Sequence, residues 1–281
     1  MRAEHTDNSG PTDSPAGTKR VPILLYHCVH RSPADAIAAY TVSPAEFGRQ
    51  LDSVVGAGLT ALTVTRFCQI LMTEGSVGLP PRPIVITFDD GFADFHDHAA
   101  PALVERGLVA TLYVTTGVLR KGGPAAEPWG QRMLDWGQLP ELEAAGTEIG
   151  AHSHTHPELD AVRRRRAREE IFLSRDLLES YLQHPVRSFA YPHGYSDARV
   201  RAMVREAGFK SACAVKNAVS WTGDDRFALA RLTIMSSTSP STFRTWLSGL
   251  GARTAPRGDS SRTRAWRVAR RTRAAVPSLA A

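Results

Sequence analysis

Short apolar runs alternate with longer segments of helical periodicity along most of this chain, and no other feature of the sequence constrains its fold as strongly. The clearest strand is Pro83–Phe88 (PIVITF), which follows a cluster of prolines and ends at Asp89-Asp90-Gly91. Further strands are expected at residues 21–26, 59–64, 109–115, 148–151, 188–191, 211–215 and 228–234, with helices between them. Strands that alternate with helices form a largely parallel sheet, so the predicted fold class is α/β.

Unusual polar residues gather where these strands end. Asp89 and Asp90 follow one strand, His152 follows another, and residues 191–194 follow a third. Because parallel α/β folds bind their ligands at the carboxyl ends of the strands, we expect these residues to share one site.

The sequence divides into a body and two polar ends. Residues 1–20 are rich in Ser, Thr, Pro and Gly and lack the apolar core of a signal peptide. We therefore predict a disordered leader and a cytoplasmic location, with export by another route left open. Residues 21–250 are predicted to form a single domain, and residues 251–281 a basic, disordered tail. No run approaches the roughly 18 consecutive apolar residues of a membrane span.

The net charge of +6 belongs to the tail. Residues 251–281 hold eight Arg and one Asp, whereas residues 1–250 sum to −1. The arginine run at residues 163–168 is followed by Glu169 and Glu170, which on a helix neutralise it in part. We expect no nucleic-acid partner, while contact of the tail with an acidic surface stays open. The three cysteines show no paired spacing, so neither a disulfide framework nor a cysteine zinc site is expected.

Adjacent carboxylates at a strand end repel each other unless a cation or hydrogen-bond donors compensate. Asp89-Asp90-Gly91 is also a common turn sequence, so the pair alone does not establish a functional site. Residues 152–157 (HSHTHP) change this balance, since His152 and His156 are spaced to bind one ion, with His154 either joining them or facing outward. Two imidazoles and one carboxylate leave a position open for water, as in catalytic zinc sites.

Three segments resemble the motifs of the polysaccharide deacetylases, the family-4 carbohydrate esterases related to the nodulation-type chitooligosaccharide deacetylases. Residues 87–91 (TFDDG) resemble the first motif, residues 152–157 the second, and residues 189–194 (FAYPHG), more weakly, the third. The likeness covers about residues 20–250. It implies a distorted (β/α) barrel of about seven parallel strands and a hydrolase that removes N-acetyl groups from an amino sugar, its oligomer or its polymer.

By position, the resemblance implies that Asp89 is the general base. It also implies that Asp90, His152 and His156 bind a divalent metal, Zn²⁺ first, with Co²⁺, Ni²⁺ or Fe²⁺ also suited to this ligand set. A backbone N–H near His193 would help to hold the oxyanion. The candidate substrate-binding residues are Tyr191, Pro192, His193, Gly194 and Trp136, with Trp129 as a further aromatic candidate. The three large aromatic side chains among them suit core packing equally well.

The chain departs from the family pattern at two positions. The third motif usually opens with an Arg that pairs with the catalytic Asp, but Ala190 stands there, and Arg231 is a candidate replacement. Most members take their general acid from a histidine after the third motif, yet no histidine follows His193. His27 is therefore the candidate general acid, as in a subgroup of permuted motif order that resembles the poly-N-acetylglucosamine deacetylases. A buried structural histidine is the alternative.

Other functions remain open at this point. The same fold and metal site suit an O-acetyl ester, a glycosylated small metabolite or another amide, and a cytoplasmic location suits a nucleotide- or lipid-linked precursor. A remoter alternative is a carbohydrate-binding protein without turnover, which Ala190 alone favours.

Overall fold

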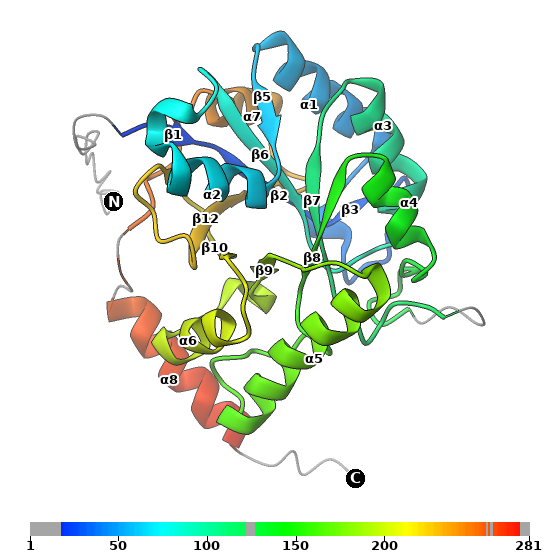
Figure 1. Cartoon of the computed structure of the whole chain (residues 1–281). Coiled ribbons are helices and arrows are strands. Elements are labelled where there is room, and N and C mark those ends of the chain that lie inside the picture. Colours follow the sequence, from blue (N-terminus) through cyan, green and yellow to red (C-terminus); the bar gives the residue numbers. More distant parts are fainter. Residues whose placement is uncertain (1–17, 122–126, 257, 259–260, 276–281) are drawn as a thin grey trace, which may run out of the picture.

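The computed structural model describes residues 18–121, 127–256, 258 and 261–275, and within them seven parallel strands close into a barrel with helices around it (Figure 1). In their order around the ring, the strands are β2 (Ile23–Tyr26), β12 (Leu229–Thr233), β10 (Ser211–Lys216), β9 (Ser188–Ala190), β8 (Thr147–Ala151), β7 (Ala110–Val114) and β6 (Pro83–Phe88). The ring closes because β6 pairs with β2. This closed ring of seven parallel strands confirms the predicted distorted (β/α) barrel.

Among the described residues, five short strands lie outside this ring. β5 (Thr60–Leu62) pairs with the first half of β6, whereas β7 pairs with its last residues, so the barrel is irregular at this edge. β3 (Cys28–Val29) and β4 (Thr41–Val42) form a small parallel ladder after β2. β1 (Arg20–Val21) pairs antiparallel with β11 (Ser220–Trp221).

Eight α-helices occur in the described part of the chain. They are α1 (Pro44–Gly56), α2 (Val64–Thr73), α3 (Ala100–Glu105), α4 (Gln138–Ala144), α5 (Arg164–Leu182), α6 (Ala198–Glu206), α7 (Pro240–Leu247) and α8 (Ser261–Ala275). Short helical turns are η1 (Ala38–Tyr40), η2 (Gly75–Gly78), η3 (Phe95–Ala99, a π-helix) and η4 (Pro192–Gly194). Among these elements, no helix is both long enough and apolar enough to cross a membrane.

Local sequence sets where several helices begin. Ser43 caps α1 by accepting a hydrogen bond from the backbone N–H of Glu46 at 3.1 Å, and Pro44 occupies the first helical position. Ser239 and Pro240 repeat this arrangement at α7. These caps satisfy amide groups that a helix leaves without an intrahelical acceptor, so each of them fixes the residue at which its helix begins.

An aromatic cluster joins the barrel to the helices around it. Tyr26 of β2 and Phe88 of β6 stack with ring centroids 5.1 Å apart, and Phe47 of α1 and Phe95 of η3 pack edge-on against them. The Asp89 N–H also donates to the Tyr26 carbonyl at 3.0 Å. These contacts fix the end of β2 beside the end of β6.

The predicted N-terminal leader falls mostly outside the described residues, which begin at residue 18. Residues 1–17 of that leader therefore stay a prediction. The expected boundary at residue 20 is too late by one residue, since Arg20 already belongs to β1 and pairs with Trp221.

The disorder predicted for residues 251–281 is wrong for Ser261–Ala275, which form α8 next to the start of α6 (Figure 1), where its arginines contact Ser196 and Asp197. The helix is held by ion pairs from Arg267 and Arg270 to Asp160, more than 100 residues away in sequence. Residues 276–281 of the predicted tail lie outside the described part of the chain.

Candidate active site

Four predicted site residues meet at the carboxyl ends of β6 and β8. Asp89 and Asp90 follow β6 directly, and His152 follows β8, with His156 one turn later. Nε2 of His152 lies 3.5 Å, and Nε2 of His156 3.3 Å, from Oδ1 of Asp90. The ligand atoms of Asp90, His152 and His156 all lie within 4.8 Å of one another, so these three side chains form a candidate metal site.

The backbone at this site adopts conformations that L-residues seldom take. The φ angle is 75° at Asp90, 63° at Ser153 and 62° at His156. Such strain persists only where surrounding contacts impose it, and it concentrates at functional sites. Ser153 Oγ accepts from the His156 N–H at 3.0 Å, and Glu170 of α5 accepts from two further N–H groups of this turn at 2.9 and 2.6 Å. α5 therefore holds the turn that carries His156.

The main chain of the neighbouring strand orients His152. Its Nδ1 lies 2.8 Å from the carbonyl oxygen of Ala190. Because a carbonyl only accepts hydrogen bonds, Nδ1 carries the proton, and in the neutral imidazole Nε2 offers its lone pair toward Asp90. Ala190 thus serves the site through its backbone.

The donor set fits a divalent metal. Asp90 Oδ1 is buried and has no hydrogen-bond partner among the described residues, which is costly for a carboxylate oxygen. Burial alone would raise the pKa of Asp90, but its contacts with His152 and His156 more than offset burial and hold the pKa well below its ordinary value. An ionised carboxylate with two imidazoles is a set that binds zinc with an open position.

Asp89 forms a bidentate ion pair with Arg231 of β12. The two terminal guanidinium nitrogens donate to Oδ1 at 2.6 Å and to Oδ2 at 2.7 Å. Arg231 is fully buried, and its Nε donates to the carbonyl of Ala214 at 2.9 Å. Burial by itself would raise the pKa of Asp89, but the charge of Arg231 outweighs it, so the pKa falls below its ordinary value. Arg231 thus lies where the sequence hypothesis requires a base-orienting residue.

His27 lies at the end of β2, close to the same carboxylates. The register pairs Tyr26 with Phe88, which places His27 beside Asp89. Its Nδ1 is buried and has no hydrogen-bond partner in the part of the chain that the structure describes. Burial lowers the pKa of His27, and the negative charges of Asp90 and Asp89 offset this effect in part. His27 is therefore positioned at the site, and its ring also contacts that of Tyr40, with centroids 5.1 Å apart.

Three of the predicted substrate-binding residues have side chains buried in the core. The Tyr191 side chain is fully buried and donates its hydroxyl to the carbonyl of Phe227 at 2.8 Å. Trp136 is 5% exposed and packs against Tyr181 of α5, with ring centroids 5.1 Å apart. Pro192 is also buried. These three side chains are therefore enclosed by the core, and their contact with substrate stays a prediction.

Other aromatic rings do border the candidate metal site. Trp129, which is partly exposed, lies edge-on to His156 with centroids 5.3 Å apart. The exposed ring of His193 lies 4.6 Å from that of His156. Gly194 is required behind it, since a Cβ there would lie 2.4 Å from a methyl group of Val215. Of the predicted sugar contacts, Trp129 and His193 are thus the side chains that remain accessible.

Asp94 lies behind the site and was not among the residues predicted from the sequence. This buried carboxylate accepts from the Cys28 thiol and from the Val29 N–H at 2.9 Å, so it anchors the residues that follow His27. A carboxylate soon after Asp89-Asp90 is the sequence signal, but nothing local marks its partners.

The profile of the family described as polysaccharide deacetylase matches residues 76–212, which contain all three motif segments. The chain belongs to the polysaccharide deacetylase family. Members of the family are hydrolases that act on N-acetyl amide bonds, and this enzyme is of that class.

Individual relatives agree with this assignment. The chain is 21% identical over 239 residues to YxkH of Bacillus subtilis (strain 168), whose name also places it among the polysaccharide deacetylases, and the match covers 85% of this chain and 79% of that protein. The deacetylase PplD of Streptococcus pyogenes, solved with acetate, superposes with a TM-score of 0.69 at 24% identity over 79% of this chain and 96% of that chain. IcaB from Ammonifex degensii gives a TM-score of 0.67 at 24% identity over 82% and 97% of the two chains. These superpositions show a shared fold.

Proposed function

We propose that this polysaccharide deacetylase family member removes N-acetyl groups from an amino sugar or its oligomer in a metal-dependent reaction. One observation carries the proposal: Asp89, held by Arg231, lies beside the Asp90, His152 and His156 cluster at one barrel mouth. A divalent metal held by those three side chains, Zn²⁺ first, would lower the pKa of a bound water and stabilise negative charge on the substrate oxygen.

Asp89 is the general base of this mechanism. It accepts a proton from the attacking water as the new bond forms to the acetamide carbonyl carbon. Its lowered pKa keeps it ionised at neutral pH, as a base must be. Arg231 uses one lone pair on each oxygen, which leaves each oxygen a second acceptor site and fixes the plane of the carboxylate.

His27 is the general acid. As the C–N bond breaks, it gives a proton to the leaving nitrogen, and the products are acetate and a free amino sugar. The negative charges of Asp90 and Asp89 favour protonation of His27, which burial opposes. Trp129 and His193 supply ring faces beside His156 on which a sugar can pack.

The test is acetate release from N-acetylglucosamine oligomers by zinc-loaded protein, run beside Asp89→Asn and beside an O-acetylated sugar. Release from the N-acetyl substrate by the wild type alone supports the reaction and the base. Release from the O-acetyl sugar alone replaces the amide with an ester as substrate. Absence of bound metal together with absence of release would overturn the proposal.

A further inference from the structure

A groove of about 980 Å³ lies between the barrel mouth and α8. His193 and Gly194 line one side of it, and Trp266 and Arg270 of α8 line the other. Because the His193 ring packs against His156, the groove begins beside the candidate metal site. Its volume is at the upper end of the range that ligand pockets span.

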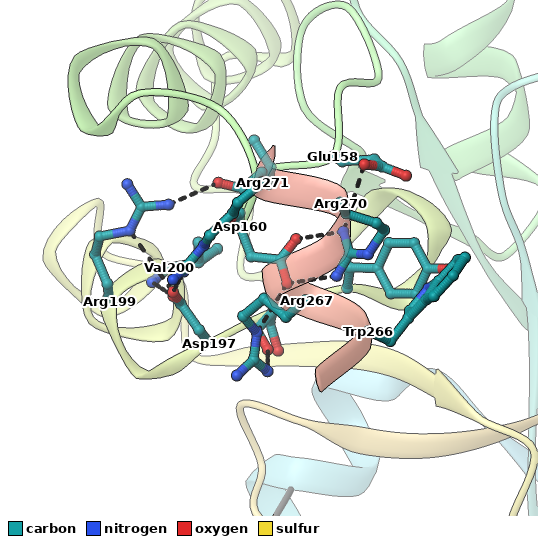
Figure 2. Close-up of polar contacts among 12 residues, drawn as sticks. Glu158, Asp160, Asp197, Arg199, Val200, Trp266, Arg267, Arg270 and Arg271 are labelled. Carbon is teal, nitrogen blue, oxygen red and sulfur yellow. Dashed lines mark hydrogen bonds and ion pairs between the residues drawn. The ribbon is translucent and has the colours of Figure 1, made fainter. Parts of the chain in front are cut away.

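The α8 wall of the groove is anchored to the barrel (Figure 2). Asp160, which is 1% exposed, accepts from Arg270 at 2.7 and 2.8 Å and from Arg267 at 3.0 Å. Arg271 adds an ion pair to Asp197 at 2.5 Å. A basic segment that the sequence suggested was a free tail is therefore a fixed part of the surface next to the site.

The lining of the groove carries an excess of positive charge. It contains five cationic side chains, Arg201, Lys216, Arg253, Arg267 and Arg270, and two carboxylates, Asp160 and Asp225. Both carboxylates are already engaged, Asp160 by α8 and Asp225 by arginines 3.7 and 3.9 Å away.

Arg253 is the cation most available to a ligand. It donates to the backbone carbonyl of Lys216 at 3.1 Å, and no carboxylate in the described part of the chain lies within ion-pair distance of it. Arg270 also retains a donor, since its buried Nε has no acceptor among the described residues. Lys216 pairs with Asp224 at 3.3 Å, and Arg270 lies 3.5 Å from Glu158 as well as beside Asp160, so Arg253 carries the positive charge of the groove that no carboxylate among the described residues offsets.

Aromatic rings continue from the site into the groove. His193 and Tyr195 lie nearly parallel, with centroids 5.9 Å apart. The Trp266 indole N–H donates to the Tyr195 hydroxyl at 3.3 Å, and Trp266 remains 51% exposed. Flat rings of this kind pack against sugar faces, while neighbouring arginines bind phosphate or carboxylate.

We propose that this groove binds an anionic group of the substrate, so that the enzyme acts on an N-acetylated amino sugar that carries a phosphate or carboxylate. This substrate class rests on the deacetylase function proposed above. Arg253 contacts the anion, Trp266 packs against the adjoining unit, and the N-acetyl group lies at the metal site. A neutral oligomer packs against the same aromatic rings but offers no anionic group to Arg253.

The experiment measures binding by titration calorimetry to full-length, zinc-loaded protein with three probes. They are neutral tri-N-acetylchitotriose, UDP-N-acetylglucosamine, and a tetrasaccharide of alternating N-acetylglucosamine and glucuronate. Arg253→Gln removes the charge but keeps a donor for the Lys216 carbonyl. The matched control is Arg82→Gln, an exposed position just before β6, at the opposite end of the barrel from Asp89.

We expect Arg253→Gln to weaken binding of at least one anionic probe about tenfold and to leave the neutral trimer unchanged, because charge-assisted hydrogen bonds are the strong ones. Arg82→Gln should change none of the three affinities. The affected probe identifies the anion as phosphate or carboxylate. Equal effects of Arg253→Gln and Arg82→Gln on both anionic probes would overturn the proposal, even if acetate release from neutral oligomers is intact. Arg253-dependent binding without any acetate release would instead support the groove and count against the deacetylase function.

Discussion

Two buried carboxylates in this protein are each held by arginine, yet they occupy different kinds of structure. Asp89 pairs with Arg231 at the barrel mouth, and Asp160 pairs with Arg267 and Arg270 of α8. The carboxylate side chains are 4% and 1% exposed, so burial does not separate them. They differ in where the arginine is attached. β12 is paired on both edges within the barrel, whereas α8 lies outside the barrel near the end of the chain (Figure 1).

This difference determines how the molecule responds when either ion pair is broken. A charge left alone in the interior is destabilising by several kcal/mol, unless it can reach water. Arg231 cannot reach water without opening the barrel, whereas α8 can undock and hydrate its arginines. Matching substitutions at the two pairs should therefore have unequal consequences.

Asp89→Asn should have the largest effect, and it should fall on catalysis. We expect kcat/KM for acetate release to drop about 10²–10⁴-fold, because the amide cannot take the proton of the attacking water. Metal content should stay close to that of the wild type, whereas the unfolding midpoint should fall, because Arg231 stays buried without its counter-charge. The control is Asp176→Asn on the exposed face of α5, which should leave the rate unchanged. A variant with near-normal turnover would show that Asp89 is not the base.

Arg231→Met should have the largest effect on folding. It leaves Asp89 buried beside Asp90 with no counter-charge, and we expect a loss of about 3–5 kcal/mol in the free energy of unfolding. Urea unfolding followed by circular dichroism measures this loss. The double variant with Asp89→Asn should recover part of it, since no unpaired charge then remains. A loss under about 1 kcal/mol would mean that the barrel relaxes around the lone carboxylate.

Asp160→Asn should lower the free energy of unfolding less than Arg231→Met does, because α8 can undock and expose its arginines to water. We expect a loss of about 1–3 kcal/mol, the range for a buried group left without its partner. Limited proteolysis should cut α8 faster in the variant. Tryptophan fluorescence should also change as α8 undocks, and the same substitution in a Trp266→Phe background shows which part of that change comes from this helix. Cleavage at the wild-type rate would contradict a clamp at Asp160.

The smallest expected effect is a pH dependence of α8 docking. Burial alone would raise the pKa of Asp160, but hydrogen bonds from Arg270 and Arg267 outweigh it, so the pKa lies below its ordinary value. A lowered folded pKa contributes stability that is fully present above the unfolded value of about 3.9 and is lost as pH falls through the folded value. Trp266 fluorescence should therefore change in the acid range in the wild type as α8 undocks. In Asp160→Asn, the fluorescence should not change with pH over the same range.

The sequence was sufficient for the parts of the site that lie within short motifs. Asp89, Asp90, His152 and His156 follow strands that their own apolar runs predict, and strand ends meet at one face of a barrel. Arg231 was also within reach, because the missing arginine at residue 190 raised the question of a substitute. For the four motif residues the signal lies within a few residues of the side chain concerned, whereas for Arg231 it lies at residue 190, in another strand.

The remaining features depend on contacts that sequence separation hides. The arginines of α8 resemble any solvated basic run until Asp160 is placed beside them, and their hydrogen bonds span 107 and 110 residues. The burial of Tyr191 and Trp136 was hidden for another reason. A large aromatic residue after a strand gives the same pattern whether it packs in the core or against a sugar.

The pairing of Asp89 with Arg231 also bears on how the protein is made. The two residues are 142 positions apart, and β12 enters the ring between β10, its neighbour in sequence, and β2, near the start of the chain. A nascent chain cannot close the ring before residue 233 has left the ribosome, and contacts of such long range form late. A translation product that ends before Arg231 therefore lacks both a complete barrel wall and the guanidinium that pairs with Asp89, so the candidate site is assembled only once β12 has joined the ring.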